Sequence, residues 1–289
     1  MEKVALFWKK LKGNVVQCQL CPHFCLIREG NRGKCNAREN QKGKLISIVY
    51  GKPCSLSLDP IEKKPLFHFY PGSKTFSLAT VGCNLSCKHC QNWEISQRDI
   101  KTVKYNEIPP EGIIRLCKDA ESNIISFTYT EPTIFYEYML DIAKLAKKEN
   151  IKCVMVTNGF INPEPLKILL EYIDAFNVDI KGMSEKFYEK ICGAKLAPIL
   201  EAIKIIHKSG RHLELTNLLI PGHNDSDKDI RKLVQWILDN LDKNVPLHFS
   251  AFYPCYQLIN LQPTQPEKVI HAAEIAKEMG MKNVHTGNI

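Results

Sequence analysis

The chain has 289 residues, of which 44% are hydrophobic and 24% charged, as is ordinary for a globular protein. No run approaches the ~20 apolar residues of a membrane span, and the N-terminal segment MEKVALFWKKLKGN lacks the apolar core of a signal peptide. We therefore expect a cytoplasmic protein with no membrane partner. The formal net charge is +8. We attribute this excess to solvated helical faces such as the one around Lys144, Lys147 and Lys148, and treat nucleic acid as an unlikely partner.

The first 74 residues are rich in glycine and cysteine and show little helical pattern. They predict a small metal-binding module, followed by a connecting arm that ends with residues 59–72. The candidate ligands of the module are Cys18, Cys21, Cys25 and Cys35. Four thiolates can close a tetrahedral zinc site or fully ligate an iron–sulfur cluster, and the spacing leaves both possibilities open. Disulfides are not expected in a cytoplasmic chain.

Residues 75–289 alternate short β-rich runs with helical patterns. The predicted strands are 75–81, 124–130, 153–158, 176–180, 213–220 and 247–253, with a candidate edge strand at 283–286. The predicted helices are 109–121, 133–149, 164–172, 198–209, 226–240 and 265–279.

These six strand–helix repeats imply an α/β fold with parallel strands and right-handed crossovers. Polar or glycine-containing clusters follow nearly every strand. In a barrel all of these strand ends meet at one mouth, whereas in an open sheet only those near the switch point would. The pattern therefore favours a partial (β/α)6 TIM-type barrel over residues 75–289.

Cys83, Cys87 and Cys90 follow the first of these strands in a Cys-x3-Cys-x2-Cys arrangement. Three thiolates can hold three irons of a four-iron cluster and leave the fourth iron open to a small molecule. The spacing resembles the signature of the radical S-adenosylmethionine (radical SAM) enzymes. That resemblance implies a [4Fe–4S] cluster whose open iron chelates SAM, a 5′-deoxyadenosyl radical as the product of SAM cleavage, and a ferredoxin or flavodoxin as electron donor.

The later strand ends resemble the SAM-binding segments of the same superfamily. Thr130 and Glu131 stand where a Gly-Gly-Glu-Pro segment binds the methionine amino group, although Tyr129 and Thr130 replace the glycines. The resemblance also implies contacts to SAM from residues that end or flank the next strands, namely Asn158, Asp179, Lys181 and, as a weaker adenine-site candidate, His248. Each has a plainer alternative as a capping acid, a turn residue, a surface lysine or a packed histidine. The order of one motif per strand end favours the SAM site.

A narrower resemblance covers nearly the whole chain. The N-terminal cysteine pattern, the segment 59–66 and the segment 90–97 are similar to those of the AmmeMemoRadiSam system radical SAM enzymes, which are related to pyruvate formate-lyase activating enzyme. Thr216 stands where the activating enzyme carries arginine, so activation of a glycyl-radical partner is kept only as an alternative. A zinc-module protein that binds nucleic acid is the rival from another class, and it leaves the strand-end motifs unexplained. No motif names the substrate, which is either a small molecule or a protein.

Overall fold

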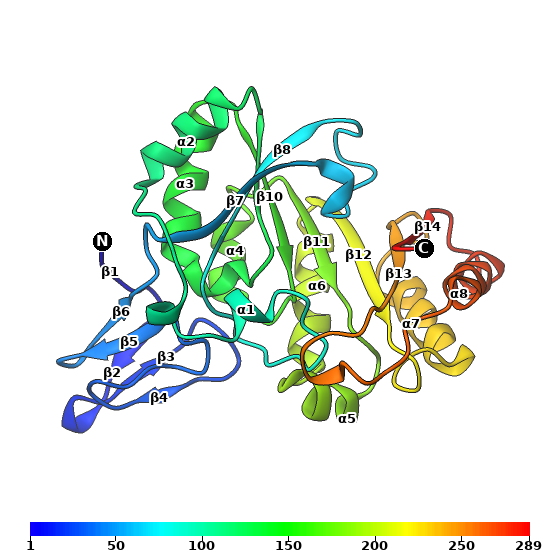
Figure 1. Cartoon of the computed structure of the whole chain (residues 1–289), viewed down its shortest axis with the longest axis horizontal. Helices are drawn as coiled ribbons and strands as arrows, with labels where there is room; N and C mark the ends of the chain where they lie inside the picture. Colours follow the sequence, from blue (N-terminus) through cyan, green and yellow to red (C-terminus); the bar gives the residue numbers. More distant parts are fainter.

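The computed structural model describes residues 1–289 as a large curved sheet flanked by helices, with a small β-rich module at one side (Figure 1). The sheet has eight strands in the order β14-β13-β12-β11-β10-β9-β8-β7. Strands β8 to β14 are parallel, and β7 pairs antiparallel with β8. Their bounds are β7 (Pro53–Pro60), β8 (Lys74–Thr80), β9 (Ile124–Phe127), β10 (Lys152–Thr157), β11 (Ala175–Asp179), β12 (His212–Leu219), β13 (Leu247–Ala251) and β14 (Val284–Gly287).

The six predicted strands, the edge strand and the six predicted helices are all confirmed. The helices are α2 (Pro110–Asp119), α3 (Tyr136–Lys148), α4 (Pro163–Leu169), α6 (Ala197–Lys208), α7 (Asp227–Asn240) and α8 (Pro266–Glu278). Four of them carry proline in the first turn, where the missing N–H breaks no helical hydrogen bond. Strands β7 and β14 are unpaired on their outer edges, so the sheet stays open, consistent with a partial barrel. None of the helices combines the length and apolar character that a membrane span requires.

Several short helical segments and one strand of the main sheet, β7, were not predicted. The helical segments include α1 (Trp93–Ser96), α5 (Glu185–Phe187) and a π-helical turn at Tyr188–Cys192, all too short for a periodic pattern. Strand β7 lies inside the segment that we assigned to the module and arm. The main sheet therefore begins at Pro53, and the division of the chain at residue 74 stays a prediction.

The N-terminal module consists of two three-stranded sheets, β1-β6-β5 and β2-β3-β4. Their bounds are β1 (Lys3–Val4), β2 (Trp8–Lys10), β3 (Val16–Cys18), β4 (Leu26–Ile27), β5 (Arg38–Gln41) and β6 (Lys44–Ser47). The buried side chains of Val16, Ile27 and Leu45 belong to the same apolar cluster as the barrel core. The module is thus packed onto the barrel rather than tethered to it.

The connecting arm, residues 59–72, crosses the N-terminal end of the barrel. The Asn177 side-chain amide donates to the Pro65 carbonyl oxygen at 2.6 Å, and the N–H groups of Phe67 and His68 donate to the Glu214 carboxylate at 3.0 and 2.8 Å. Leu66 packs in an apolar cluster with residues at the start of the strands, including Ile124 and Ala175. The arm therefore fills the N-terminal end of the barrel and leaves the C-terminal strand ends open.

Because Glu214 binds the arm that closes the N-terminal end of the barrel, we expect the stability of this plug, formed by residues 59–72, to depend on pH. Its side chain is fully buried and also pairs with His212 at 2.8 Å and His248 at 2.6 Å. Burial raises the pKa of Glu214, but these hydrogen bonds outweigh it and hold the pKa well below the ordinary 4.5. A depressed carboxyl pKa gives stability that is present above the ordinary value and lost as the pH falls below it.

We expect Glu214→Gln to be less stable than the unaltered chain at pH 7, because the amide cannot accept all four hydrogen bonds. The difference in unfolding free energy between the two proteins should become smaller as the pH falls below about 4.5. Urea unfolding of both proteins at pH 7 and at lower pH measures it. A difference that grows with acid would contradict this account.

Candidate functional site

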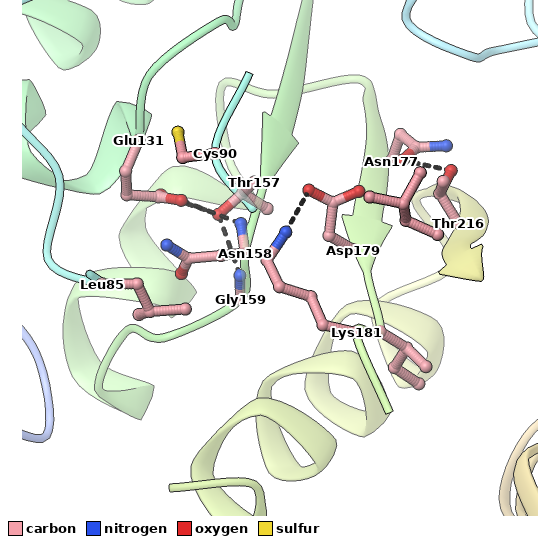
Figure 2. Close-up of polar contacts among 12 residues, drawn as sticks. Leu85, Cys90, Glu131, Thr157, Asn158, Gly159, Asn177, Asp179, Lys181 and Thr216 are labelled. Atoms are coloured by element: carbon pink, nitrogen blue, oxygen red, sulfur yellow. Dashed lines mark hydrogen bonds and ion pairs between the residues drawn. The ribbon is translucent and has the colours of Figure 1, made fainter. Parts of the chain in front are cut away.

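A cavity of about 520 Å³ opens at the C-terminal ends of the strands. Its wall contains eight residues that the sequence predicted for the cluster and SAM, together with Thr216, the position at which the activating enzyme carries arginine. The eight are Cys83, Cys87, Cys90, Thr130, Glu131, Asn158, Asp179 and Lys181. Figure 2 shows Glu131, Asn158, Asp179 and Lys181 converging from successive strand ends. Motifs that follow one another along the chain, one at each strand end, thus line the wall of a single cavity.

The cysteine loop is fixed by backbone hydrogen bonds to the π-helical turn at Tyr188–Cys192. The N–H groups of Ser86 and Lys88 donate to the carbonyl oxygens of Cys192 and Ile191, both at 2.9 Å. Cys87, which lies between Ser86 and Lys88 in the loop, is buried. The loop is therefore held in place by the protein, so its three thiols are presented to the cavity by a rigid frame.

His89 lies within the cysteine loop and is a site residue that sequence reasoning missed. Its ring lines the cavity, is 4% exposed, and has no hydrogen-bond partner for Nδ1. Burial and the nearby Lys181 cation lower the pKa of His89 to about 3, so the ring is neutral at pH 7. In the tautomer that carries its proton on Nδ1, this buried and unpartnered nitrogen would donate to a sulfide of an iron–sulfur cluster. Its place between two cysteines was the only sequence signal.

Glu131 joins the ends of β9 and β10. Its carboxylate accepts hydrogen bonds from the Thr157 hydroxyl at 2.7 Å (Figure 2), from the Asn158 N–H at 2.8 Å and from the Thr133 N–H at 3.0 Å. Burial, the largest influence, raises the pKa of Glu131. A carboxylate has about four lone-pair sites, so one acceptor direction remains for an ammonium group.

The hydroxyl of Thr130 is already used within the protein. It donates to the Thr80 carbonyl oxygen at 2.8 Å and so links the end of β8 to the loop after β9. Any contact from Thr130 to a ligand would therefore come from its backbone.

Asp179 and Lys181 form an ion pair at the end of β11, with the Lys181 ammonium 2.9 Å from the Asp179 carboxylate (Figure 2). Burial acts to lower the pKa of Lys181, but Asp179 and the Cys87 thiol outweigh it and raise the pKa well above its usual range. Lys181 is thus a fixed cation in the cavity wall, able to neutralise a ligand carboxylate. Beside it, the Thr216 hydroxyl donates to the Asn177 side-chain oxygen at 2.9 Å.

The structure gives His248 a different place from the adenine contact that we expected. It is the second residue of β13, near the N-terminal end of the strand, and is absent from the cavity wall. Its ring bonds Glu214 and packs against Phe67 with ring centroids 4.8 Å apart. His248 therefore belongs to the contacts that hold the arm, because its strand begins level with the floor of the cavity.

The four N-terminal cysteines lie together in a second, smaller cavity between the module and the barrel. Cys21 and Cys35 have raised pKa values, to about 12 and about 11, because burial disfavours their thiolates. The structure thus groups all four predicted ligands of the module.

Comparisons with known proteins agree with this site. The radical SAM superfamily matches residues 77–237, which include the cysteine loop and the strand ends up to β12. An uncharacterized protein of Methanocaldococcus jannaschii, MJ0808, is 47% identical over 285 residues, covering 99% of this chain and 85% of that protein. Pyruvate formate-lyase 1-activating enzyme of Escherichia coli is 24% identical over 217 residues, covering 70% of this chain and 87% of the enzyme.

Solved structures show the same fold at low sequence identity. A radical SAM methyltransferase from Sphaerobacter thermophilus has a TM-score of 0.58 at 16% identity, over 76% of this chain and 67% of that one. Streptococcus suis SuiB, solved with bound S-adenosylmethionine, has a TM-score of 0.56 at 16% identity, over 72% of this chain and 48% of that one. The narrower AmmeMemoRadiSam resemblance stays a prediction. The match over more than half of the chain shows that it belongs to the radical SAM superfamily, whose members are enzymes that use a [4Fe–4S] cluster and S-adenosylmethionine.

Proposed function

We propose that this enzyme reductively cleaves SAM at a [4Fe–4S] cluster held by Cys83, Cys87 and Cys90, and abstracts hydrogen from a substrate that its motifs do not name. The observation that carries the proposal is the cavity that these cysteines share with the strand-end groups. When bound, the cluster and SAM together supply one electron to the sulfonium and so a 5′-deoxyadenosyl radical. The open position left by three ligands and the unpartnered Nδ1 of His89 both fit that cofactor.

The residues of the chain would seat SAM by charge and shape. Lys181 would neutralise the SAM carboxylate, and the free acceptor direction of Glu131 would take its ammonium. The Asn158 amide lies 2.9 Å from the Asn84 side-chain oxygen and 3.8 Å from the Cys83 sulfur, so it would orient the ligand beside the cluster. The arm closes the cavity from below and would shield a reactive radical from water.

An acidic one-electron carrier, a ferredoxin or flavodoxin, would be the electron donor. The excess positive charge is not spread over helical faces as we expected. Residues 1–52 contain 11 Lys or Arg and 3 Asp or Glu, a balance of +8, whereas residues 53–289 carry 28 of each sign. Charge of one sign on one module favours association with a partner of the opposite sign.

Activation of a glycyl-radical protein is the second candidate. It is supported by the similarity to activating enzymes, of which the Escherichia coli enzyme is one. It would make the substrate a protein backbone. Thr216, hydrogen-bonded to Asn177, replaces the arginine of that enzyme, so this candidate rests on sequence similarity alone.

The test is SAM cleavage after anaerobic reconstitution with iron and sulfide. With dithionite as reductant, the chain should release 5′-deoxyadenosine, and Cys87→Ala should reduce the yield to background. Cys54→Ala is the matched control, because the Cys54 thiol bonds the Ala79 carbonyl oxygen at 3.5 Å and lies outside both cysteine cavities. Background yield from the unaltered chain, or full yield from Cys87→Ala, would overturn the proposal.

A further inference from the structure

Cys18, Cys21, Cys25 and Cys35 surround a small cavity. The cavity between them measures about 20 Å³, above the roughly 10–15 Å³ that one water molecule requires. Tetrahedral zinc, with Zn–S bonds of about 2.3 Å, would draw the four sulfurs to within about 4 Å of one another. No three His, Cys, Asp or Glu side chains in the structure are arranged to hold one metal ion. As the structure has them, the four module sulfurs therefore do not converge on one ion.

Two buried polar groups in the wall of this cavity have no hydrogen-bond partner. They are Arg38 Nε and the Thr133 hydroxyl, on side chains that are 1% and 0% exposed. Buried donors are almost always satisfied in native proteins. The sulfides of an iron–sulfur cluster are acceptors that a lone zinc ion does not provide. The Arg38 guanidinium also lies 3.9 Å from the Cys18 sulfur, where its charge would offset that of thiolate ligands.

The small cavity and the SAM cavity share a thin wall. Gly82, next to Cys83, has a φ of +113°, and a Cβ placed on it would lie 2.5 Å from the carbonyl oxygen of Cys35. His23, which follows Cys21, bonds the Asn84 carbonyl oxygen at 2.7 Å. The segments that carry the two cysteine sets are therefore in direct contact, through a neighbour of Cys83 and the carbonyl group of Cys35 itself.

The module also has an exposed surface to which an electron donor could bind. Phe24, between Cys21 and Cys25, is 46% exposed, and the nearby Arg28 and Lys34 are exposed cations. An acidic carrier docked there would stand closer to the module cysteines than to the buried Cys87.

We infer that the four module cysteines hold a second [4Fe–4S] cluster that relays electrons to the SAM-cleaving cluster. The receiving half of this inference rests on the function proposed above. A reduced ferredoxin or flavodoxin gives one electron to the module cluster and is itself oxidised. The module cluster returns to its oxidised state by reducing the second cluster, and that electron breaks the carbon–sulfur bond of SAM to leave methionine and the radical.

The first experiment reads the metal without using activity. A chain with Cys83, Cys87 and Cys90 all changed to alanine keeps only the module set, and is reconstituted anaerobically with iron, sulfide and equimolar zinc. We expect about four irons per chain, little zinc, and a dithionite-reduced [4Fe–4S] EPR signal that SAM leaves unchanged. The unaltered chain should hold about eight irons. Zinc in place of iron would overturn the inference and leave the proposed function standing.

The second experiment separates relay from support of the fold. Cys21→Ser combined with Cys25→Ser should retain 5′-deoxyadenosine formation with dithionite within about threefold, because a small reductant enters the open cavity. With reduced flavodoxin, its rate should fall at least tenfold. Cys54→Ser is the control and should keep both rates. Equal losses with both reductants, or no loss with flavodoxin, would overturn the relay; failure of the unaltered chain with dithionite would instead overturn the proposed function.

Discussion

Replacing Arg38 by methionine is expected to lower the free energy of unfolding by about 3–5 kcal/mol. Arg38 and Glu137 form an ion pair in which each side chain is 1% exposed, and the change leaves the Glu137 carboxylate charged and buried without its partner. The guanidinium also donates to the Leu6 carbonyl oxygen at 2.9 Å, so the module would lose an internal hydrogen bond as well. Urea unfolding under anaerobic conditions measures the loss.

The double variant Arg38→Met with Glu137→Gln should recover part of that loss. The amide removes the buried charge and keeps an oxygen for the Leu6 N–H, which bonds Glu137 at 2.8 Å. Lys118→Met is the matched control, because its pair with Glu149 is about half exposed on both sides and should be worth less than about 1 kcal/mol. A similar cost for Arg38→Met and Lys118→Met would show that the buried pair does not hold the module.

Gly82→Ala is expected to destabilise the contact between the module and the cysteine loop. The backbone conformation at this position strains any residue other than glycine by about 1–3 kcal/mol. In addition, the new Cβ would lie 2.5 Å from the Cys35 carbonyl oxygen, so either the segment around Gly82 or the segment around Cys35 must move. Gly72→Ala is the control: φ is +80°, but no atom lies within 4 Å of the new Cβ. The contact is measured by how much more Gly82→Ala lowers the free energy of unfolding than Gly72→Ala does. Equal losses of unfolding free energy in the two variants would show that the segments around Gly82 and Cys35 are not in close contact.

The parallel sheet and the cavity wall could be predicted because each depends on local sequence. Buried strands such as the one through Cys153–Met155 are continuous apolar runs, and the polar residues that follow them must meet at one mouth. The route of the arm could not be predicted, because Leu66 and Phe67 find their partners in strands far along the chain. The misplacement of His248 has the same cause, since its partner Glu214 is set by that route.

Other features were visible in the sequence and were missed. The concentration of positive charge in residues 1–52 needs only a count by segment. The choice between zinc and a cluster was different: it depends on the spread of four thiols and on the unpartnered Arg38 Nε, which no spacing encodes.

The plug of the barrel also constrains the order in which this protein folds. Phe67 and Glu214 are 147 residues apart, so at a synthesis rate of about 5–20 residues per second the arm waits roughly 7–30 s on the ribosome for its main partner. During that interval Ile61 and Leu66 have no completed barrel to enter. Contacts of such long sequence separation slow folding, so closure of the barrel floor should be a late event. Chaperone dependence of this enzyme would then arise from the arm rather than from its iron.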